Sequence, residues 1–334
     1  MAVNADKPER WPDDIKRSVE LYNQWFIQFA PQAYAQARIA TANLVRQTLA
    51  ATRNLTNIQP AILADNPASL CILRTLTMPP VARERLAGLA GVPLTLLATM
   101  DKKGMLPPRM RRAAAMAHLT NVAEVIRRLI DTELFPWVGE NRDPSEQELQ
   151  RATYIIADRH CGAAADPIIR NEQERRQLRI VGEWLNAHGY QYLGPGNGLT
   201  HDTMHPGTYA FRLNVPAELR TSAEEAEAAG LEVAEGTNTV NIPVDIAVKP
   251  KNSSLDEMPV LIEAKSAGDF TNTNKRRKEE ATKMTQLRGT FGDRVKYALF
   301  LCGYFGKKYL EYEASEGIDW VWEHRPDDLA YLGI

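Results

Sequence analysis

Three charged side chains, Asp245, Glu263 and Lys265, occur where two predicted strands would bring them together. Asp245 belongs to a predicted strand over residues 240–248, and the other two belong to a second strand over residues 259–265. Side chains alternate between the faces of a strand, so Glu263 and Lys265, which are two residues apart, share a face. If the two strands pair as neighbours, Asp245 lies beside Glu263. Paired carboxylates are ligands that a hard cation such as Mg²⁺ prefers, so this pattern predicts a metal site with an ammonium group beside it.

The chemistry expected of such a site is attack on a phosphoryl group. A bound cation lowers the pKa of a water molecule and neutralises charge on a phosphoryl oxygen. Lys265 can orient or help to deprotonate that water, and it can stabilise the charge of a pentacovalent transition state. The second strand is otherwise apolar from Val260 to Ile262, and charges at the end of a buried strand are costly unless they are paired or bound to metal. A structural Glu–Lys ion pair at a sheet edge is the alternative.

A polar and then strongly basic stretch follows the second strand, at the start of a helix predicted over residues 274–291. Cations at the beginning of a helix oppose its dipole, and they are better explained if an anion binds there. The alternative is a solvated charged helix face, in which Glu279 and Glu280 compensate Lys283. On the first interpretation, phosphates or base edges are contacted by Asn272, Asn274, Lys275, Arg276, Arg277 and Lys278.

The elements around these residues predict an α/β fold with a central mixed sheet flanked by helices. The apolar run at residues 297–304 is typical of a buried central strand. It follows, in chain order, a helix over residues 171–187, short strands at 190–193 and 209–215, the two strands described above and the basic helix.

The first half of the chain is predicted to be helical. A chain of 334 residues is longer than a typical single domain, so we predict a helical domain over residues 1–165 and an α/β domain over residues 166–334. Residues 58–67 are predicted to be a break without secondary structure. Helices are expected over residues 12–55, with an interruption at Pro31, and over residues 68–76, 81–90, 113–134 and 144–160.

Residues 82–104 have the spacing of a helix-turn-helix. One helix is predicted to end at Gly91, and Pro93 starts another at its favoured first turn. A basic run follows, with Lys102 and Lys103 at its head. The functional interpretation is contact with DNA, and the alternative is an ordinary helical hairpin with a solvated basic face.

Composition excludes several classes of protein. The net charge is −2, so a basic surface for a nucleic acid has to be local. Three widely spaced cysteines without a CxxC pair argue against a disulfide framework or a thiolate zinc site, and they fit a reducing cytosol. The charged N-terminus does not resemble a signal peptide, and no run of about 18 apolar residues is available to span a membrane. We therefore expect a cytoplasmic protein without a membrane partner.

The motif Pro243-Val244-Asp245, followed by Glu263-Ala264-Lys265, resembles the core of the PD-(D/E)XK nucleases. More narrowly, the chain resembles the XamI-like type II restriction endonucleases of bacteria. That similarity is carried by LFPWVGENRDPSEQE at residues 134–148, NEQERR at 171–176 and IEAKSAGDFTNTNKRRKEEATK at 262–283. One departure is that Asp245 follows a valine and not directly a proline, which leaves the ligand itself in place.

The resemblance implies Mg²⁺-dependent, sequence-specific hydrolysis of double-stranded DNA, with Asp245, Glu263 and Ala264 as metal ligands and Lys265 as the catalytic lysine. A helical domain would clamp or read the DNA. Palindromic sites require two active sites related by a two-fold axis, which implies a homodimer. A cognate DNA methyltransferase is expected as a functional counterpart and not as a bound subunit.

In nucleases of this fold, a carboxylate on the helix before the sheet often joins the metal site. Glu172 or Glu174 could do so, although their spacing on a helix allows at most one to point inward. Each is alternatively an acid favoured near a helix N-terminus. Two other functions stay open: a structure-specific repair or recombination nuclease with the same metal site, and a non-enzymatic DNA-binding regulator that uses residues 82–104.

Overall fold

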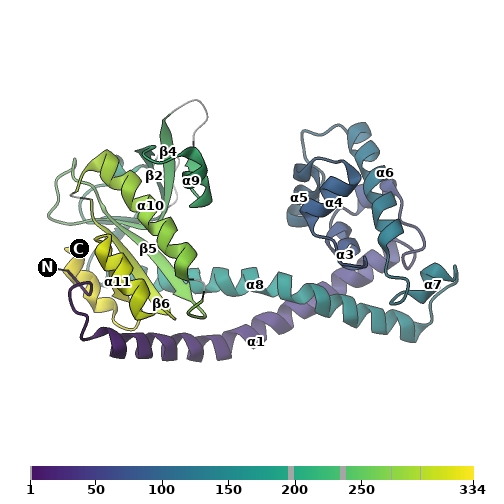
Figure 1. The fold of residues 1–334 in the computed structure, drawn as a ribbon, viewed down its shortest axis with the longest axis horizontal. Helices are drawn as coiled ribbons and strands as arrows, with labels where there is room; N and C mark the ends of the chain where they lie inside the picture. The colour runs from purple at the N-terminus through teal and green to yellow at the C-terminus, as the bar shows by residue number, and fades with distance from the viewer. Residues whose placement is uncertain (1, 195–198, 234–237, 272, 294) are drawn as a thin grey trace. The chain divides into compact units, whose positions relative to one another are not determined.

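The computed structural model describes residues 2–194, 199–233, 238–271, 273–293 and 295–334 (Figure 1). The chain forms two compact units. One contains Met1–Phe29 together with Arg170–Ile334, and the other contains Ala30–Ile169. The boundary between residues 169 and 170 lies close to the predicted domain boundary after residue 165. The first 29 residues, however, belong with the C-terminal unit.

Hydrogen bonds explain why the N-terminal residues join the C-terminal unit. The backbone N–H groups of Asn4 and Ala5 each donate to Oδ1 of Asp319 over 3.0 Å. Nearby, the Arg325 guanidinium lies 2.9 Å from the buried carboxylate of Asp14. A residue near the C-terminus thus satisfies the N-terminal backbone, a contact that no local sequence pattern could predict.

Two long helices contain residues of both units. Helix α1 spans Trp11–Ala51 and helix α8 spans Glu146–Ala187, with Pro31 and Pro167 in their interiors. The predicted interruption at Pro31 is therefore wrong, and the helices predicted over 144–160 and 171–187 are one. A proline removes one backbone hydrogen bond from a helix, and the remaining bonds and the buried side chains beyond Pro31, such as Ala33, keep α1 continuous.

The unit of residues 30–169 is built from short helices between these two long ones. Its core includes Leu70, Leu96 and Leu119, and the indole of Trp137 donates to the Asn54 carbonyl over 2.8 Å. One of these helices lies in the predicted break at residues 58–67. The helices are α2 (Pro60–Asp65), α3 (Ser69–Thr75), α4 (Arg83–Ala90), α5 (Leu94–Lys103), α6 (Arg112–Leu129) and α7 (Pro136–Gly139).

A seven-stranded sheet is the centre of the other unit, with the order β1-β2-β4-β5-β6-β7 and β3 paired to β4. The pairs β2/β4, β3/β4 and β4/β5 are antiparallel, whereas β1/β2, β5/β6 and β6/β7 are parallel. This mixed sheet confirms the predicted α/β class. The strands are β1 (Gln191–Tyr192), β2 (Thr208–Glu218), β3 (Glu232–Val233), β4 (Thr239–Lys249), β5 (Val260–Ala267), β6 (Tyr297–Gly303) and β7 (Asp319–Trp322).

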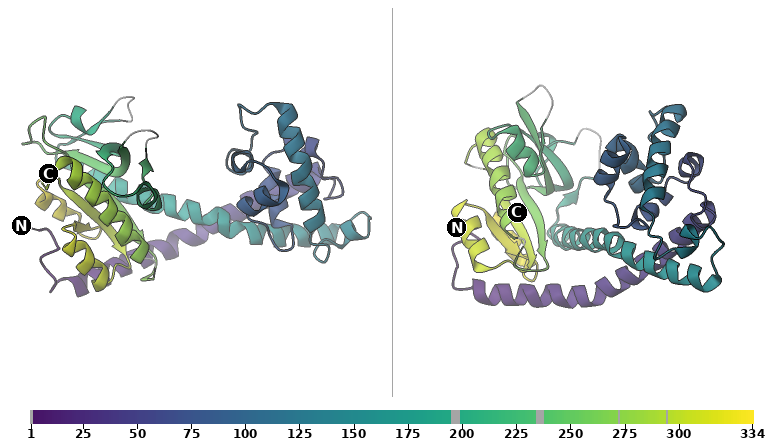
Figure 2. Two further views of the ribbon diagram at one scale, coloured as in Figure 1. Left: turned by 45° about the horizontal axis from the view of Figure 1, so that its top comes forward. Right: turned by 45° about the vertical axis from the view of Figure 1, so that its right-hand side comes forward.

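Helices cover both faces of the sheet. Helix α10 (Thr273–Phe291) and helix α11 (Lys307–Ser315) lie beside each other on one face (Figure 2). Leu261 of β5 packs into the core on that side. Its neighbour Ile262 packs on the opposite side, against the C-terminal part of α8. The remaining elements are helix α9 (Ala223–Ala228) and the 3-10 helices η1 (His201–Thr203) and η2 (Pro326–Leu332). No helix in the described ranges is long and apolar enough to cross a membrane.

One buried acid on α11 makes the stability of this unit depend on pH. Burial and the nearby charge of Glu280 raise the pKa of Glu313 to about 8, above the value of an unfolded chain, so the folded state favours the protonated carboxyl. The contribution of Glu313 to the free energy of unfolding is therefore greatest below about pH 4.5. It falls as the pH rises toward 8, by up to about 1.4 kcal/mol per pH unit.

We expect Glu313→Gln to remove this loss, because glutamine keeps the shape of the protonated acid. The gain in Tm over the parent protein should be small at pH 5 and should grow toward pH 8 in thermal unfolding measurements. Glu311→Gln is the matched control, since it removes the same charge from an exposed position of the same helix. A gain for Glu313→Gln that does not change with pH would contradict the prediction.

Candidate active site

The two strands place Asp245 beside Glu263, as the sequence predicts. The antiparallel pairing of β4 with β5 ends at Ile246 opposite Ile262, the chain neighbours of Asp245 and Glu263. The backbone N–H of Ala264 donates to Oδ2 of Asp245 over 2.8 Å. This bond fixes the carboxylate of Asp245 at the edge of β5.

Lys265 lies between two carboxylates. Its Nζ is 3.1 Å from Oε1 of Glu263 and 2.8 Å from Oε1 of Glu280, on α10. Lys283, one turn further along α10, places its Nζ 2.6 Å from the same Oε1 of Glu263. Tyr297 of β6 donates its hydroxyl to Oε2 of Glu280. Two adjacent strands and a covering helix therefore build one charged cluster.

The sequence analysis assigned no site role to Glu280 or Lys283, which it considered only in the alternative of a solvated helix face. In the structure Glu280 is fully buried and Lys283 is 5% exposed. A signal was present, since Glu280 precedes the buried Met284 by four residues and Leu287 by seven, the spacing of one helix face. A charge at an apolar-face position indicates a buried partner.

The cluster carries an excess of negative charge, because the three carboxylates of Asp245, Glu263 and Glu280 face the two ammonium groups of Lys265 and Lys283. Burial and the charge of Glu263 together raise the pKa of Asp245 to about 7. Burial alone would lower the pKa of Lys265, but the Glu280 and Glu263 carboxylates outweigh it and raise that pKa. The site thus favours an additional cation next to Asp245.

A cavity of about 290 Å³ adjoins these groups, and its walls include Asp245, Glu263 and Lys265. Within the described part of the chain, Oε2 of Glu263 is buried without a hydrogen-bond partner. No three His, Cys, Asp or Glu side chains of the described residues gather at metal-binding distance. Two carboxylates with a backbone carbonyl and water nevertheless suit Mg²⁺, which keeps several of its waters. The residues present therefore fit a hard divalent cation.

Of the two auxiliary acids, only Glu174 is placed at the cavity. It lines the cavity wall and accepts from Nε and from a terminal nitrogen of Arg212, over 3.1 and 2.8 Å. Arg212 lies on β2 between Phe211 and Leu213, which pair with Ile246 and Val244 of β4, and its backbone is left-handed (φ 55°). Glu172 forms a pair with Arg175 over 3.2 Å and is not among the residues that line the cavity.

The predicted DNA-binding residues are divided between two elements, α10 and α5. Lys278 is exposed in the first half of α10, and the guanidinium of Arg277 lies 4.9 Å from the ring centre of Tyr312. Lys102 and Lys103 are exposed in the last turn of α5, in the other compact unit. Asn272 and the side chains of Asn274, Lys275 and Arg276 lie outside the described residues.

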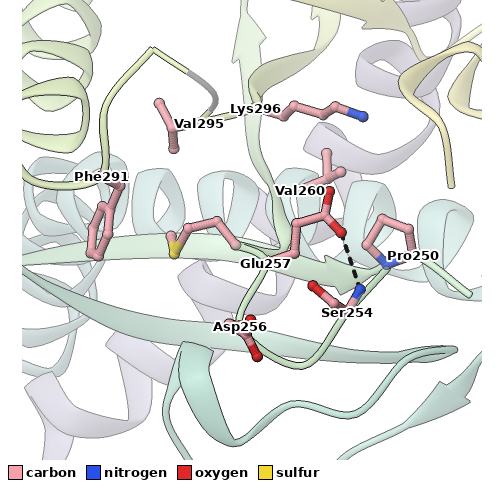
Figure 3. A pocket seen from close by; sticks show the side chains of 9 residues that line it. Pro250, Ser254, Asp256, Glu257, Val260, Phe291, Val295 and Lys296 are labelled. Atoms are coloured by element: carbon pink, nitrogen blue, oxygen red, sulfur yellow. Dashed lines mark hydrogen bonds between the residues drawn. The ribbon is translucent and has the colours of Figure 1, made fainter. Parts of the chain in front are cut away.

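A larger cavity, of about 540 Å³, opens at the far end of β5 (Figure 3). Its lining includes Val260, the first residue of β5, as well as Asp256, Glu257 and Lys296. The backbone N–H of Ser254 donates to Glu257 over 3.1 Å. None of the predicted site residues lines this cavity, so we do not assign it to the phosphoryl chemistry.

Comparisons with known proteins agree with the motifs. The family model described as XamI restriction endonuclease matches residues 53–322. The chain is 49% identical over 333 residues to the type II restriction enzyme SalI of Streptomyces albus G, which covers 99% of each chain. No solved structure matches. These matches confirm the family resemblance predicted from the sequence.

The charge excess predicts opposite effects of Asp245→Asn on stability and on metal binding. Asparagine can still accept from the Ala264 N–H, but it removes a buried negative charge beside Glu263. We therefore expect a higher Tm without metal at pH 8, and an affinity for Mn²⁺ lower by at least about tenfold in calorimetric titration. Glu172→Gln, which removes an acid that does not line the cavity, should change neither quantity. Unchanged Mn²⁺ affinity in Asp245→Asn would contradict the metal assignment.

Proposed function

Because this chain belongs to the XamI restriction endonuclease family, we propose that it is a type II restriction endonuclease that hydrolyses phosphodiester bonds at specific sites in double-stranded DNA. The observation that carries the proposal is the convergence of Asp245, Glu263 and Lys265 at one cavity. This geometry supplies two acidic metal ligands and one ammonium group. The family supplies DNA as the substrate.

The metal proposed for this site is Mg²⁺, held by the carboxylates of Asp245 and Glu263 and by the backbone carbonyl of Ala264. When bound, such a cation lowers the pKa of water and offsets the charge of the phosphoryl group. Lys265 then holds its ammonium group at the same cavity. There it donates to the attacking water or to a non-bridging phosphate oxygen, and it stabilises the charge that develops in the transition state.

Helix α8 forms one wall of the cavity, and its residue Glu174 has a different role from that of Lys265. Glu174 is anchored by Arg212, and a carboxylate held in this way can orient a water or a metal-bound water without itself moving. We therefore propose Glu174, and not Glu172, as the auxiliary acid. The family resemblance implies that water attacks the phosphorus in line with its bond to O3′. Breaking that bond leaves a 5′-phosphate and a 3′-hydroxyl.

DNA binding is proposed for basic side chains at two places, since phosphate contacts position a duplex and need cations. The first is the start of α10, which follows the catalytic strand and carries Arg277 and Lys278 in its first turns. The second is the end of α5 in the helical unit, with Lys102 and Lys103.

We further propose that two copies of the chain act together, in the bacterial cytoplasm, on a palindromic site. A two-fold axis through such a site requires one active site for each strand. One chain has a mass of 37.4 kDa. Sedimentation of the protein is expected to give twice that mass. A DNA methyltransferase is the expected functional counterpart of the enzyme, as a separate protein.

Incubation with plasmid DNA and Mg²⁺ tests the activity. We expect discrete, reproducible fragments, and sequencing of their ends gives the recognition site and the cut position. Lys265→Ala should lower the rate by about 10²–10³-fold, as loss of a transition-state donor does. The exposed Lys307→Ala on α11 is the control and should cleave normally.

Other outcomes separate the alternatives. A product pattern that depends on branches, ends or damage and not on sequence would indicate a structure-specific nuclease. Binding of DNA without any cleavage would indicate a regulator. Full Mg²⁺-dependent cleavage by both Asp245→Ala and Lys265→Ala would show that the site is elsewhere.

A further inference from the structure

We propose that Glu280 of α10 is a positioning residue for Lys265, and that Lys283 has the same role for Glu263. The inference rests on the proposed function, because it concerns how the nuclease site is held. It gives a functional role to the middle of α10, whereas the proposed function involves only the basic first turns of this helix. The observation behind it is a pair of buried, oppositely charged side chains on α10 that reach the two charged residues of β5.

Among the described side chains of α10, three buried polar ones lie at three-residue intervals on its inner face: Glu280, Lys283 and Gln286, which are 0, 5 and 0% exposed. Gln286 accepts from the backbone N–H of Arg220 over 2.5 Å and donates to the Thr221 hydroxyl over 2.8 Å. Its contacts therefore hold a loop. Glu280 and Lys283 instead meet the charged ends of Lys265 and Glu263.

Stability alone does not explain such a pair. Taking charges out of water costs as much as their attraction returns, and apolar residues of similar volume are often as stable. Other buried positions on the same face of α10 are occupied by the apolar residues Met284 and Leu287. Retaining an acid and a base at Glu280 and Lys283 makes sense if their direction matters for the residues that they hold.

The contacts divide the carboxylate of Glu263 into two parts. Its Oε1 receives both Lys265 and Lys283, over 3.1 and 2.6 Å. Its Oε2 is buried without a hydrogen-bond partner in the described part of the chain. Lys283 thus fixes one oxygen and leaves the other for a cation.

Glu280 provides a second anchor for the ammonium group of Lys265. A cation held by Glu263 would weaken the attraction between this carboxylate and Lys265 and would repel the ammonium group. The Oε1 of Glu280, 2.8 Å from the same Nζ, retains Lys265 at the cavity. Tyr297, which donates to the other oxygen of Glu280, fixes the direction of that anchor.

Single-turnover cleavage of a DNA duplex that contains the recognition site tests the role of Glu280. Glu280→Gln is expected to lower the cleavage rate constant by roughly 10- to 100-fold, the size of effect that a small misplacement of a catalytic group produces. DNA affinity measured in EDTA should stay the same. Tyr297→Phe, a milder change in the same chain of contacts, should give a smaller loss in the same direction.

A double-mutant cycle distinguishes positioning of Lys265 from a merely structural role of Glu280. If Glu280 acts through Lys265, then Glu280→Gln should cost little more in a Lys265→Ala background than Lys265→Ala costs alone. Gln286→Met, a buried polar-to-apolar change on the same helix face, is the matched control. Its cleavage rate, corrected for the folded fraction, should equal that of the parent protein.

Lys283→Met tests the second contact, because methionine keeps the length of the side chain without the charge. The expected change is in the Mg²⁺ concentration for half-maximal cleavage, by at least about threefold, since Lys283 acts through the metal ligand Glu263. Saturating Mg²⁺ should recover most of the rate, which it should not do for Glu280→Gln.

The outcomes separate this inference from the proposed function. Full activity of Lys265→Ala would overturn the site assignment itself. A slow Lys265→Ala combined with additive losses for Glu280→Gln, or with normal rates for both Glu280→Gln and Tyr297→Phe, would overturn the inference alone. If Glu280→Gln does not fold, the cycle between Tyr297→Phe and Lys265→Ala decides by the same criterion.

Discussion

The burial of an uncompensated charge cluster between β5 and α10 is the constraint on which the rest of the catalytic unit depends. Each ion that leaves water costs several kcal/mol, on the order of what a good partner returns, and in this cluster three carboxylates share two ammonium groups. The apolar layers around the sheet must supply the free energy that offsets this cost. In the proposed function, one more cation would offset this excess of negative charge.

Register is the means by which the fold meets that constraint. In β5, Leu261 packs toward one core cluster and Ile262 toward the other, so a slip of one residue would bury the wrong side of the strand. The same register brings Asp245 of β4 to β5, where its carboxylate accepts from the Ala264 N–H, and it sets Lys265 within reach of α10. Core packing therefore fixes the distance between the charged groups that we propose for catalysis. The parallel pairing of β5 with β6 adds Tyr297 to the same cluster.

The sequence predicted those parts of the site that depend on local pattern. Alternation along the strands placed Asp245 beside Glu263, and the strand period put Glu263 and Lys265 on one face. Glu280 entered only the alternative of a solvated helix face, and its burial depends on the packing of α10 on the sheet, which no local pattern gives. The same holds for Asp319, whose bonds to the first residues of the chain join segments more than 300 residues apart.

Local rules also failed where a proline lies within a long helix. Pro31 predicts an interruption, since it cannot donate a backbone hydrogen bond, yet α1 continues through it, and α8 continues through Pro167. Both prolines lie within three residues of the points where the chain passes from one compact unit to the other. Buried residues lie close to both prolines, among them Ala30, Ala33 and Ala165, so packing supports each helix near the hydrogen bond that its proline lacks.

In the proposed function the cluster acts on the phosphate and not on base edges, and this separates cleavage from sequence recognition. A phosphate presents the same oxygens at every nucleotide, so Asp245, Glu263 and Lys265 carry no sequence information. Discrimination needs donors and acceptors that reach the grooves, and these must lie outside the buried contacts of β5 and α10. Because the cluster is held from within the unit, by Glu280, Lys283 and Tyr297, groove-reading side chains can differ among relatives without disturbing it. A self-supporting catalytic cluster is therefore what a family needs if its members are to cut at different sequences with the same chemistry.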